Sequence, residues 1–379
     1  MMTDIRKILF LTGTRADFGK IKSLIEIIEI TDGFEAHIVV TGMHLQKMYG
    51  YTLNEILRCN YKNVTKFNNE TSEYTMDLSL AKTVIGLSTQ IKKINPDLIV
   101  VHGDRIEALA GAIVGALNNI LVAHIEGGEL SGTIDEIIRH STSKMSHIHF
   151  VSNNEARQRL IQMGELDDSI HIIGSPDLDV MFSKKLPNIF EVKKYYEIVF
   201  SDYAVVMFHP VTTEFEKMKY YVSQFVDSLL EDNNNYVIIF PNNDLGSKII
   251  LDEYKRLENN KRFLIYPSIR FEYFLTLLKK SNFIIGNSSA GIREAPYYNV
   301  PTINIGSRQS NRSFNKSIIN TDYNKKNILK GIKEVVKIKT EKTYNDFGSG
   351  NSSKKFVEIL KLKNFWNTNN QKQFKDLNF

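Results

Sequence analysis

Short apolar segments alternate with segments of helical periodicity along most of this chain, and this alternation restricts the possible folds strongly. In the first half, the apolar segments cover residues 7–12, 37–42, 98–101, 120–124, 147–152 and 170–176. Several of the stretches between them, such as the predicted helix from about Tyr74 to Ile94, repeat apolar residues at the spacing of an α-helix. Alternating strands and helices predict βαβ units, and therefore an α/β fold with a doubly wound parallel sheet.

The alternation pauses between Leu178 and Asp202 and then resumes. The later apolar segments cover residues 203–210, 236–244, 262–268, 282–289 and 301–307. We therefore predict two Rossmann-like domains, residues 1–185 and 186–379, facing each other across a cleft in a GT-B-like arrangement. A last helix near residues 353–362 is expected to cross the domain junction, with a mobile polar tail after it.

Composition narrows the class of protein. The 379 residues are 42% hydrophobic and 24% charged, which is typical of a soluble globular protein. A net charge of +5 is too small and too mixed in sign to favour nucleic acid, and the Lys- and Asn-rich stretch at 315–339 is expected to be a solvated face. The longest small-apolar stretch, residues 108–117, is too short to span a bilayer, the run after Lys7 is too short for a signal peptide, and Cys59 is the only cysteine. We therefore expect a cytoplasmic protein with no membrane partner.

Acidic residues gather just after predicted strands between residues 96 and 140. Asp104 follows the strand at 98–101, Glu126 and Glu129 follow the strand at 120–124, and Asp135 precedes a predicted helix. The carboxyl ends of parallel strands meet at one sheet edge, where open α/β sheets bind ligands. Acids held close together there suit proton transfer. The alternative is that they are helix caps and solvated loop residues, and capping alone would account for Asp135.

The segment GNSSAGIREAP, residues 286–296, joins a predicted strand to a predicted helix in the second domain. Backbone N–H groups, the hydroxyls of Ser288 and Ser289 and the positive helix end would suit a pyrophosphate. Glu294, one turn later, could accept hydrogen bonds from a ribose. The absence of GxGxxG and of a P-loop Lys-Ser/Thr pair disfavours dinucleotide redox chemistry and ATP hydrolysis. The alternative is an ordinary strand-to-helix turn with serine caps.

A second turn of this kind, TGTRADFGK, occupies residues 12–20. Gly13 would allow close backbone approach, and Arg15 offers a guanidinium fork for phosphate, although a surface salt bridge would also explain Arg15. His209 follows a strand of the second domain and is expected to project into the cleft. A GxSxG nucleophile elbow is absent, which argues against an α/β-hydrolase.

Histidines cluster near several strand ends. The pairs His102-x-Asp104 and His124-x-Glu126 could in principle chelate a metal, and His44 and His140 also follow predicted strands or lie near them. No HExxH motif or cysteine-containing set accompanies them. We therefore expect neither a metal nor another cofactor.

Seven motifs of this chain resemble those of a known family: GTRADFGK, TGMHL, VHGDR, HIEGGELSGTIDEIIRH, FHP, FPNND and GNSSAGIREAP. Together, from Lys7 to about Arg312, they resemble the hydrolysing UDP-N-acetylglucosamine 2-epimerases of bacterial sialic acid synthesis. The resemblance implies a GT-B-like fold and conversion of UDP-N-acetylglucosamine to N-acetylmannosamine and UDP. Non-hydrolysing relatives typically have Pro-Glu after the first GTR, where this chain has Ala16 and Asp17, which favours the hydrolysing branch.

The resemblance also implies roles for individual residues. It places three acids at the sugar, and Arg139, His209 and Arg15 at the phosphates and the cleft. The residues implied as catalytic are Asp104, Glu126, Asp135, His209 and Arg139. Those implied to bind substrate or nucleotide are Gly13, Arg15, Asn242, Ser288, Ser289, Gly291 and Glu294. The expected partner is a UDP-sugar, and the expected assembly is a homodimer or homotetramer.

Other functions remain open at the level of sequence. A related hydrolysing epimerase would act on a UDP-diacetamido-trideoxyglucose or on GDP-N-acetylglucosamine. A non-hydrolysing epimerase would return UDP to the glycal intermediate, and a glycosyltransferase would need an acceptor. A non-catalytic sugar-nucleotide sensor is the alternative outside enzymes, and the intact acids disfavour it.

Overall fold

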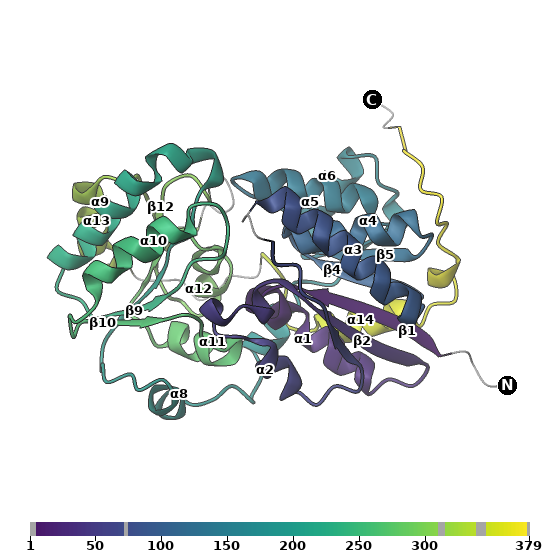
Figure 1. The fold of residues 1–379 in the computed structure, drawn as a ribbon, viewed down its shortest axis with the longest axis horizontal. Coiled ribbons are helices and arrows are strands. Elements are labelled where there is room, and N and C mark those ends of the chain that lie inside the picture. The colour runs from purple at the N-terminus through teal and green to yellow at the C-terminus, as the bar shows by residue number, and fades with distance from the viewer. Residues whose placement is uncertain (1–4, 72–74, 310–314, 339–345, 377–379) are drawn as a thin grey trace. The chain divides into compact units, whose positions relative to one another are not determined.

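The computed structural model describes residues 5–71, 75–309, 315–338 and 346–376 (Figure 1). Tyr74, the expected start of one helix, and Arg312, the expected end of the family resemblance, lie outside these ranges. The chain divides into two compact units. The first contains the described residues up to Glu129, Asp135–Ser183 and those from Asp346 onward, and the second contains Leu130–Ile134 and the described part of Lys184–Asn345. Within the described ranges, no helix is long and apolar enough to cross a membrane.

The first unit is built on a parallel sheet of seven strands among the described residues. The strands are β1 (Arg6–Thr12), β2 (Phe34–Val40), β3 (Val64–Lys66), β4 (Leu98–His102), β5 (Leu121–Ile125), β6 (Ile148–Val151) and β7 (Ile170–Ile172). Their order is β3-β2-β1-β4-β5-β6-β7, so the chain runs outward from β1 in both directions. The two sides of a strand face different cores: Ile8 and Phe10 of β1 join one apolar cluster, and Leu9 and Leu11 join the other. Burial of both faces explains why these strands read as unbroken apolar runs.

Helices follow most strands of the first unit. They are α1 (Arg15–Glu29), α2 (Leu53–Leu57), α3 (Met76–Ile94), α4 (Ile106–Leu117), α5 (Ile134–Met145), α6 (Asn154–Gln162) and α7 (Asp177–Met181), with short 3₁₀ turns η1 (Gly42–Leu45), η2 (Lys47–Tyr49) and η3 (Asp167–Ser169). α1 begins with a capping box, because the Thr14 hydroxyl accepts from Asp17 N while the Asp17 carboxylate accepts from Thr14 N.

The second unit has a parallel sheet of six strands among the described residues. Their order is β10-β9-β8-β11-β12-β13, with β8 (Ala204–Met207), β9 (Tyr236–Ile239), β10 (Phe263–Tyr266), β11 (Ile284–Gly286), β12 (Thr302–Ile305) and β13 (Ile318–Thr321). The helices are α8 (Ile189–Tyr195), α9 (Met218–Glu231), α10 (Ser247–Tyr254), α11 (Phe271–Lys279), α12 (Glu294–Tyr297) and α13 (Lys325–Val335), with η4 (Thr212–Lys217), η5 (Lys255–Leu257) and η6 (Ser289–Gly291). The prediction of two parallel-sheet α/β domains is therefore confirmed.

The Lys- and Asn-rich stretch is not simply a solvated face. It contains the edge strand β13 and the amphipathic helix α13. Ile328, Ile332 and Val335 of α13 are buried in the core of the second unit, while lysines occupy the outer side. The stretch has apolar residues at helical spacing among its many lysines, and the sequence prediction did not recognise this pattern.

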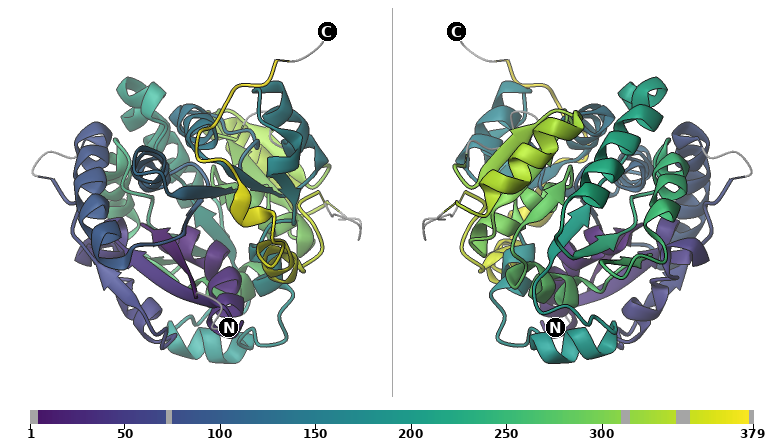
Figure 2. Two further views of the ribbon diagram at one scale, coloured as in Figure 1. Left: turned by 90° about the vertical axis from the view of Figure 1, so that its right-hand side faces the viewer. Right: turned by 90° about the vertical axis from the view of Figure 1, so that its left-hand side faces the viewer.

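The C-terminal segment folds onto the first unit, although the sequence placed it in the second domain. Helix α14 (Ser352–Leu360) and the turn η7 (Phe365–Asn367) bring Phe356, Leu360 and Phe365 into the first core. The rings of Phe150 and Phe356 lie 4.8 Å apart (centroid to centroid). Figure 2 shows this segment, in yellow, running along the first unit. The aromatic contacts assign this helix to the core of the first unit.

The polar tail after η7 is also docked on the first unit. The Asn370 side chain donates to the Asn119 carbonyl (2.8 Å), and the Lys375 backbone N–H donates to the Gly164 carbonyl (3.2 Å). The ring of Phe374 lies 4.9 Å from the Lys144 ammonium. Such polar and cation–π contacts follow no period of two or 3.6 residues, so the sequence suggested a mobile tail instead.

Candidate active site

Glu126 is the centre of a buried polar network at the carboxyl edge of the first sheet. It follows β5 with a left-handed backbone (φ 63°), which is uncommon for a residue with a side chain. The hydroxyl of Ser175 donates to its Oε1, and Nε2 of His102 lies 3.2 Å from its Oε2. Both contacts hold the carboxylate in one orientation, although its partners come from segments far apart in the sequence.

A buried lysine adds positive charge to this network. Nζ of Lys20, on α1, lies 3.9 Å from Oε2 of Glu126 and 3.3 Å from Oδ2 of Asp177. All three side chains are buried. The sequence prediction did not select Lys20, Ser175 or Asp177 for the site. A usable indication was present for Lys20, because this charged residue lies among the apolar positions of α1 that face the core.

Arg139 brings two of the predicted acids together. From α5 its guanidinium donates to the backbone carbonyl of Glu126 (2.7 Å) and to the carboxylate of Asp104. Asp135 lies four residues earlier and therefore on the same side of α5. Asp135 is the second residue of α5, not the residue before it, so helix capping does not account for its position.

The turn after β1 holds a carboxylate that the sequence prediction missed. A Cβ atom on Gly13 would lie 2.6 Å from Cδ of Glu107, and one on Gly42 would lie 2.7 Å from its Oε1. Gly13 therefore permits the buried Glu107 side chain to approach the backbone. Arg15, predicted to bind phosphate, forms an ion pair with Glu55, as the salt-bridge alternative allowed.

The buried histidines of the first unit act as hydrogen-bonding groups. His124 donates from Nε2 to the Gly103 carbonyl (2.8 Å) and accepts at Nδ1 from the Ser143 hydroxyl (2.9 Å). His44 lies between the hydroxyls of Thr12 and Thr52. Burial lowers the pKa of His44 to about 4 and holds the pKa of His124 well below its ordinary value, so both are neutral at pH 7.

No group of three or more His, Cys, Asp or Glu within the described ranges is arranged to hold a metal ion. The pair His124-x-Glu126 illustrates the reason, since His124 is engaged with Gly103 and Ser143 while Glu126 contacts His102 and Ser175. Glu129 is held by the Ser152 hydroxyl (2.8 Å).

In the second unit, Asn287 fixes the backbone of His209. Its Oδ1 accepts from the His209 N–H (2.6 Å), and its Nδ2 donates to the His209 carbonyl (2.8 Å). Nδ1 of His209 accepts from the backbone N–H of Asn242 (3.0 Å). A neutral His209 must therefore carry its proton on Nε2, which makes this atom a donor. The predicted residue Asn242 acts on His209 through its backbone.

The serine turn of the second unit differs from the expected helix start. Ser288 accepts from the Ala290 N–H (3.3 Å) at the start of η6, a turn of three residues. The helix that follows, α12, has only four residues, so it contributes little of the dipole on which the anion-site prediction depended. Ser289 begins η6, and the Glu294 side chain is buried at the start of α12.

Gly291 has a packing role in this turn. A Cβ atom there would lie 2.6 Å from Cγ2 of Thr302, whose hydroxyl donates to the Gly291 carbonyl (2.7 Å). The glycine therefore lets η6 lie directly against β12.

Comparison with known proteins identifies the family. A family model described as UDP-N-acetylglucosamine 2-epimerase matches residues 27–361. The chain belongs to the UDP-N-acetylglucosamine 2-epimerase family. The resemblance of its seven motifs to UDP-N-acetylglucosamine 2-epimerases is thereby confirmed at the level of the family.

The chain is also similar to individual members of this 2-epimerase family. It is 50% identical to the UDP-N-acetylglucosamine 2-epimerase of Neisseria meningitidis serogroup B, over 99% of this chain and 100% of the relative. It is 33% identical to the UDP-N,N'-diacetylbacillosamine 2-epimerase (hydrolyzing) of Legionella pneumophila, over 94% of this chain and 96% of the relative. The fold is similar to a crystal structure of the Methanocaldococcus jannaschii UDP-GlcNAc 2-epimerase in complex with UDP-GlcNAc and UDP (TM-score 0.78, 24% identity, 93% of this chain and 99% of that chain).

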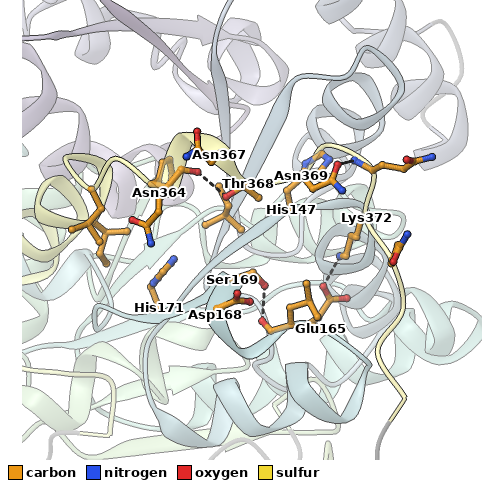
Figure 3. A pocket seen from close by; sticks show the side chains of 17 residues that line it. His147, Glu165, Asp168, Ser169, His171, Asn364, Asn367, Thr368, Asn369 and Lys372 are labelled. Carbon is orange, nitrogen blue, oxygen red and sulfur yellow. Dashed lines mark hydrogen bonds and ion pairs between the residues drawn. The ribbon is translucent and has the colours of Figure 1, made fainter.

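The first unit of this 2-epimerase family member also has a cavity of about 400 Å³ (Figure 3). It is lined by residues at the amino ends of β6 and β7 and by the C-terminal segment, among them His147, Glu165, His171, Asn364 and Lys372. In a parallel sheet this edge is opposite to the one that carries Glu126. None of the residues predicted for the site lines this cavity.

Proposed function

We propose that this protein is a hydrolysing UDP-N-acetylglucosamine 2-epimerase, which converts UDP-N-acetylglucosamine and water to N-acetylmannosamine and UDP. The observation that carries the proposal is the pair of acids joined by Arg139, with Asp104 bound through its carboxylate and Glu126 through its carbonyl. Family membership supplies the substrate class, and the Ala16-Asp17 sequence after GTR supports the hydrolysing branch.

The chemistry explains why several acids are needed. No carbonyl group acidifies the C2 hydrogen of the sugar ring, so its removal is coupled to departure of UDP from C1. A carboxylate takes the C2 proton, the C1–O bond breaks with its electron pair leaving on UDP, and a C1=C2 double bond forms 2-acetamidoglucal. An acid then delivers a proton to C2 from the opposite face while water adds at C1 and loses one proton to a carboxylate. Two faces of one carbon require two proton-handling groups.

We assign the proton transfers to Asp104, Glu126 and Asp135. Glu126 and Asp104 are connected through Arg139, and Asp135 lies one turn from Arg139 on α5. Fixed carboxylates of this kind lose little orientational freedom during the reaction. His102 and Ser175 position Glu126, and Lys20 provides a compensating charge within the first unit.

We assign contacts with the leaving diphosphate to hydrogen-bond donors of the chain, among them His209. His209 offers its Nε2–H because Nδ1 is occupied by the Asn242 N–H. Arg15, Ser288, Ser289 and Glu294 are proposed to contact the nucleotide. Donors placed where negative charge develops stabilise the transition state more than the ground state.

The experiment is proton NMR of the purified protein with UDP-N-acetylglucosamine in heavy water. The expected product is N-acetylmannosamine with deuterium at C2, released in step with UDP. Product that retains its C2 hydrogen would exclude elimination and hydration. A UDP-linked product would indicate the non-hydrolysing reaction instead.

One second candidate is supported by a specific comparison. The Legionella relative is named as a hydrolysing epimerase of UDP-N,N'-diacetylbacillosamine. The same acids would serve that sugar, since the reaction at C1 and C2 is the same. Parallel assays with both UDP-sugars compare kcat/KM directly, and a preference for the diacetamido sugar would favour this candidate.

A further inference from the structure

Helix α5, which carries Asp135 and Arg139, ends against the C-terminal tail. The last carbonyl groups of an α-helix have no partner within the helix. Here the ammonium of Lys372 donates to the carbonyls of Ser143 (3.1 Å), Lys144 (2.9 Å) and Ser146 (2.6 Å). A single cation from residue 372 therefore caps the C-terminal end of α5, where positive charge also suits the helix dipole.

The same ammonium completes an ionic cluster around the buried Glu165. Nζ of Lys372 lies 2.5 Å from Oε2 of Glu165. Figure 3 marks this ion pair with a dashed line. Glu165 also accepts from the ammonium of Lys144 (2.8 Å) and from Nε2 of His149 (3.0 Å). Burial by itself raises the pKa of Glu165, but the His149 hydrogen bond and the nearby lysines outweigh it and lower the pKa to about 2. Glu165 is therefore an anion, which Lys372 and Lys144 neutralise.

The tail carries Lys372 to this position through polar contacts. His147 accepts at Nδ1 from the Val122 N–H (3.1 Å) and donates from Nε2 to the Asn370 carbonyl (3.1 Å). The Asn370 side chain donates to the Asn119 carbonyl. The cavity lies beside the tail at this point (Figure 3). Lys372 therefore joins the tail to the backbone of α5, while the ring of Phe374 lies beside the Lys144 side chain.

The opposite end of α5 is the catalytic end in the proposed function. Asp135 lies eight residues before Ser143, a distance of about 12 Å along the helix. Between them, Arg139 contacts Asp104 and the Glu126 carbonyl. A helix held at both ends transmits a displacement of one end to the other as a rigid element.

We propose that Lys372 is a positioning residue for the reaction: it holds α5 so that Asp135 and Arg139 meet their partners at the carboxyl edge of the sheet. This inference depends on the proposed function, because it takes those two residues as working groups. Lys372 touches neither the sugar nor the nucleotide in this scheme. Its loss should therefore lower kcat and leave nucleotide binding intact.

The test compares Lys372→Met with Lys375→Met in the full chain. Both changes remove one positive charge from the same tail, but Lys375 is exposed and contributes its backbone N–H to Gly164. We expect Lys372→Met to lower kcat roughly 10-fold or more, since a misplacement of about 1 Å can cost 10²-fold. The UDP dissociation constant, measured by calorimetry, should stay within about twofold. Lys375→Met should match the parent in both quantities, and Lys372→Arg, which retains charge and donors, should recover most of kcat.

Hydrogen exchange measured by mass spectrometry gives a readout independent of activity. In Lys372→Met, peptides covering residues 134–145 should exchange faster, while those of the second unit should be unchanged. Should Lys372→Met fold poorly, Lys372→Gln keeps two donors for the carbonyls and is expected to show an intermediate loss of kcat. Faster exchange with an unchanged kcat would overturn the proposal, as would equal effects of Lys372→Met and Lys375→Met. If the parent shows no epimerase activity, the proposed function fails, whereas unchanged exchange in α5 contradicts the positioning role itself.

Discussion

At the scale of single residues, the site depends on side chains whose conformational freedom is restricted by hydrogen bonds and ion pairs. Glu126 combines a left-handed backbone with fixed contacts to His102 and Ser175. Asp104 is held by Arg139. Each contact costs conformational entropy on folding, and that cost is met before substrate binds.

Replacement of the acids is expected to separate chemistry from binding. Asp104→Asn and Glu126→Gln keep the size of the side chain but cannot exchange protons as the acids do. We expect kcat to fall by about 10² or more, the scale of general acid–base catalysis. UDP affinity, measured by calorimetry, should change little. An Asp104→Asn enzyme with normal kcat and weak UDP binding would show that the assignment of chemistry to the first unit is wrong.

His44 makes the stability of the first unit depend on pH. Burial lowers its pKa from 6.5 to about 4, against the raising effect of Asp17. Between these two pH values the unfolded chain binds a proton that the folded chain does not, so stability is lost as the pH falls. The contribution amounts to roughly 3 kcal/mol by pH 4.

The measurement is the free energy of unfolding of the first unit in urea at pH 7 and at pH 5. Wild type should lose more stability over this interval than His44→Gln, which has no group to protonate. Equal losses in the two proteins would mean that His44 is not buried as a neutral side chain. Other buried histidines, such as His124, are common to both proteins and cancel in the comparison.

At the scale of elements, close approach between a turn and a strand decides which residues are allowed. η6 lies against β12, and the space between Gly291 and Thr302 is too small for another carbon atom. The same principle applies in the first unit, where Gly13 makes room for Glu107. Both glycines belong to motifs for which the sequence suggested ligand contact, and the structure adds a steric reason for each.

Gly291→Ala should therefore destabilise the second unit by overpacking, by about 1–3 kcal/mol. Thr302→Ser removes the Cγ2 atom that the new methyl group would meet and keeps the hydroxyl that donates to the Gly291 carbonyl. The double variant Gly291→Ala/Thr302→Ser should thus be more stable than Gly291→Ala alone. Chemical unfolding of the three variants checks this order, and simple additivity of the two changes would refute the steric explanation.

At the scale of the whole molecule, the chain builds its first unit, then its second, and returns to the first. Phe356 is fully buried with Phe10 and Phe150 in the first core, although residues 184–338 of the second unit precede it. The stability of the first unit therefore depends on the last part of the chain. The docking of the C-terminal segment on the first unit also places Lys372 at the end of α5.

Phe356→Ala should cost about 3–5 kcal/mol of stability, the range for large core residues cut to alanine. Hydrogen exchange should rise in peptides of β1 and β6, which contain Phe10 and Phe150, and stay unchanged in peptides of β8 and β11. Leu229→Ala, in the core of the second unit, is the matched control and should give the reverse pattern. An increase confined to the second unit in Phe356→Ala would contradict the division described above.

The sequence by itself determined the fold class and indicated which residues lie at the carboxyl edge of each sheet. Runs such as residues 98–101 are apolar because both faces of a parallel strand are buried, and acids placed directly after them must lie at the carboxyl edge. Asp104 and Glu126 could therefore be predicted as neighbours, and the structure joins both to Arg139, which the sequence indicated only through the family resemblance. Local periodicity is sufficient for such predictions because it depends only on residues close in the chain.

Only the tertiary structure decided which distant residues become partners. Ser175 lies 49 positions from Glu126, and Lys372 lies 228 positions from Lys144. It also showed that η6 is a short turn instead of a long helix, and that α14 completes the first core. The physical reason is the same in each case: a hydrogen bond or an aromatic contact between remote segments leaves no periodic trace in either segment. Such a contact is selected by the geometry of the folded chain.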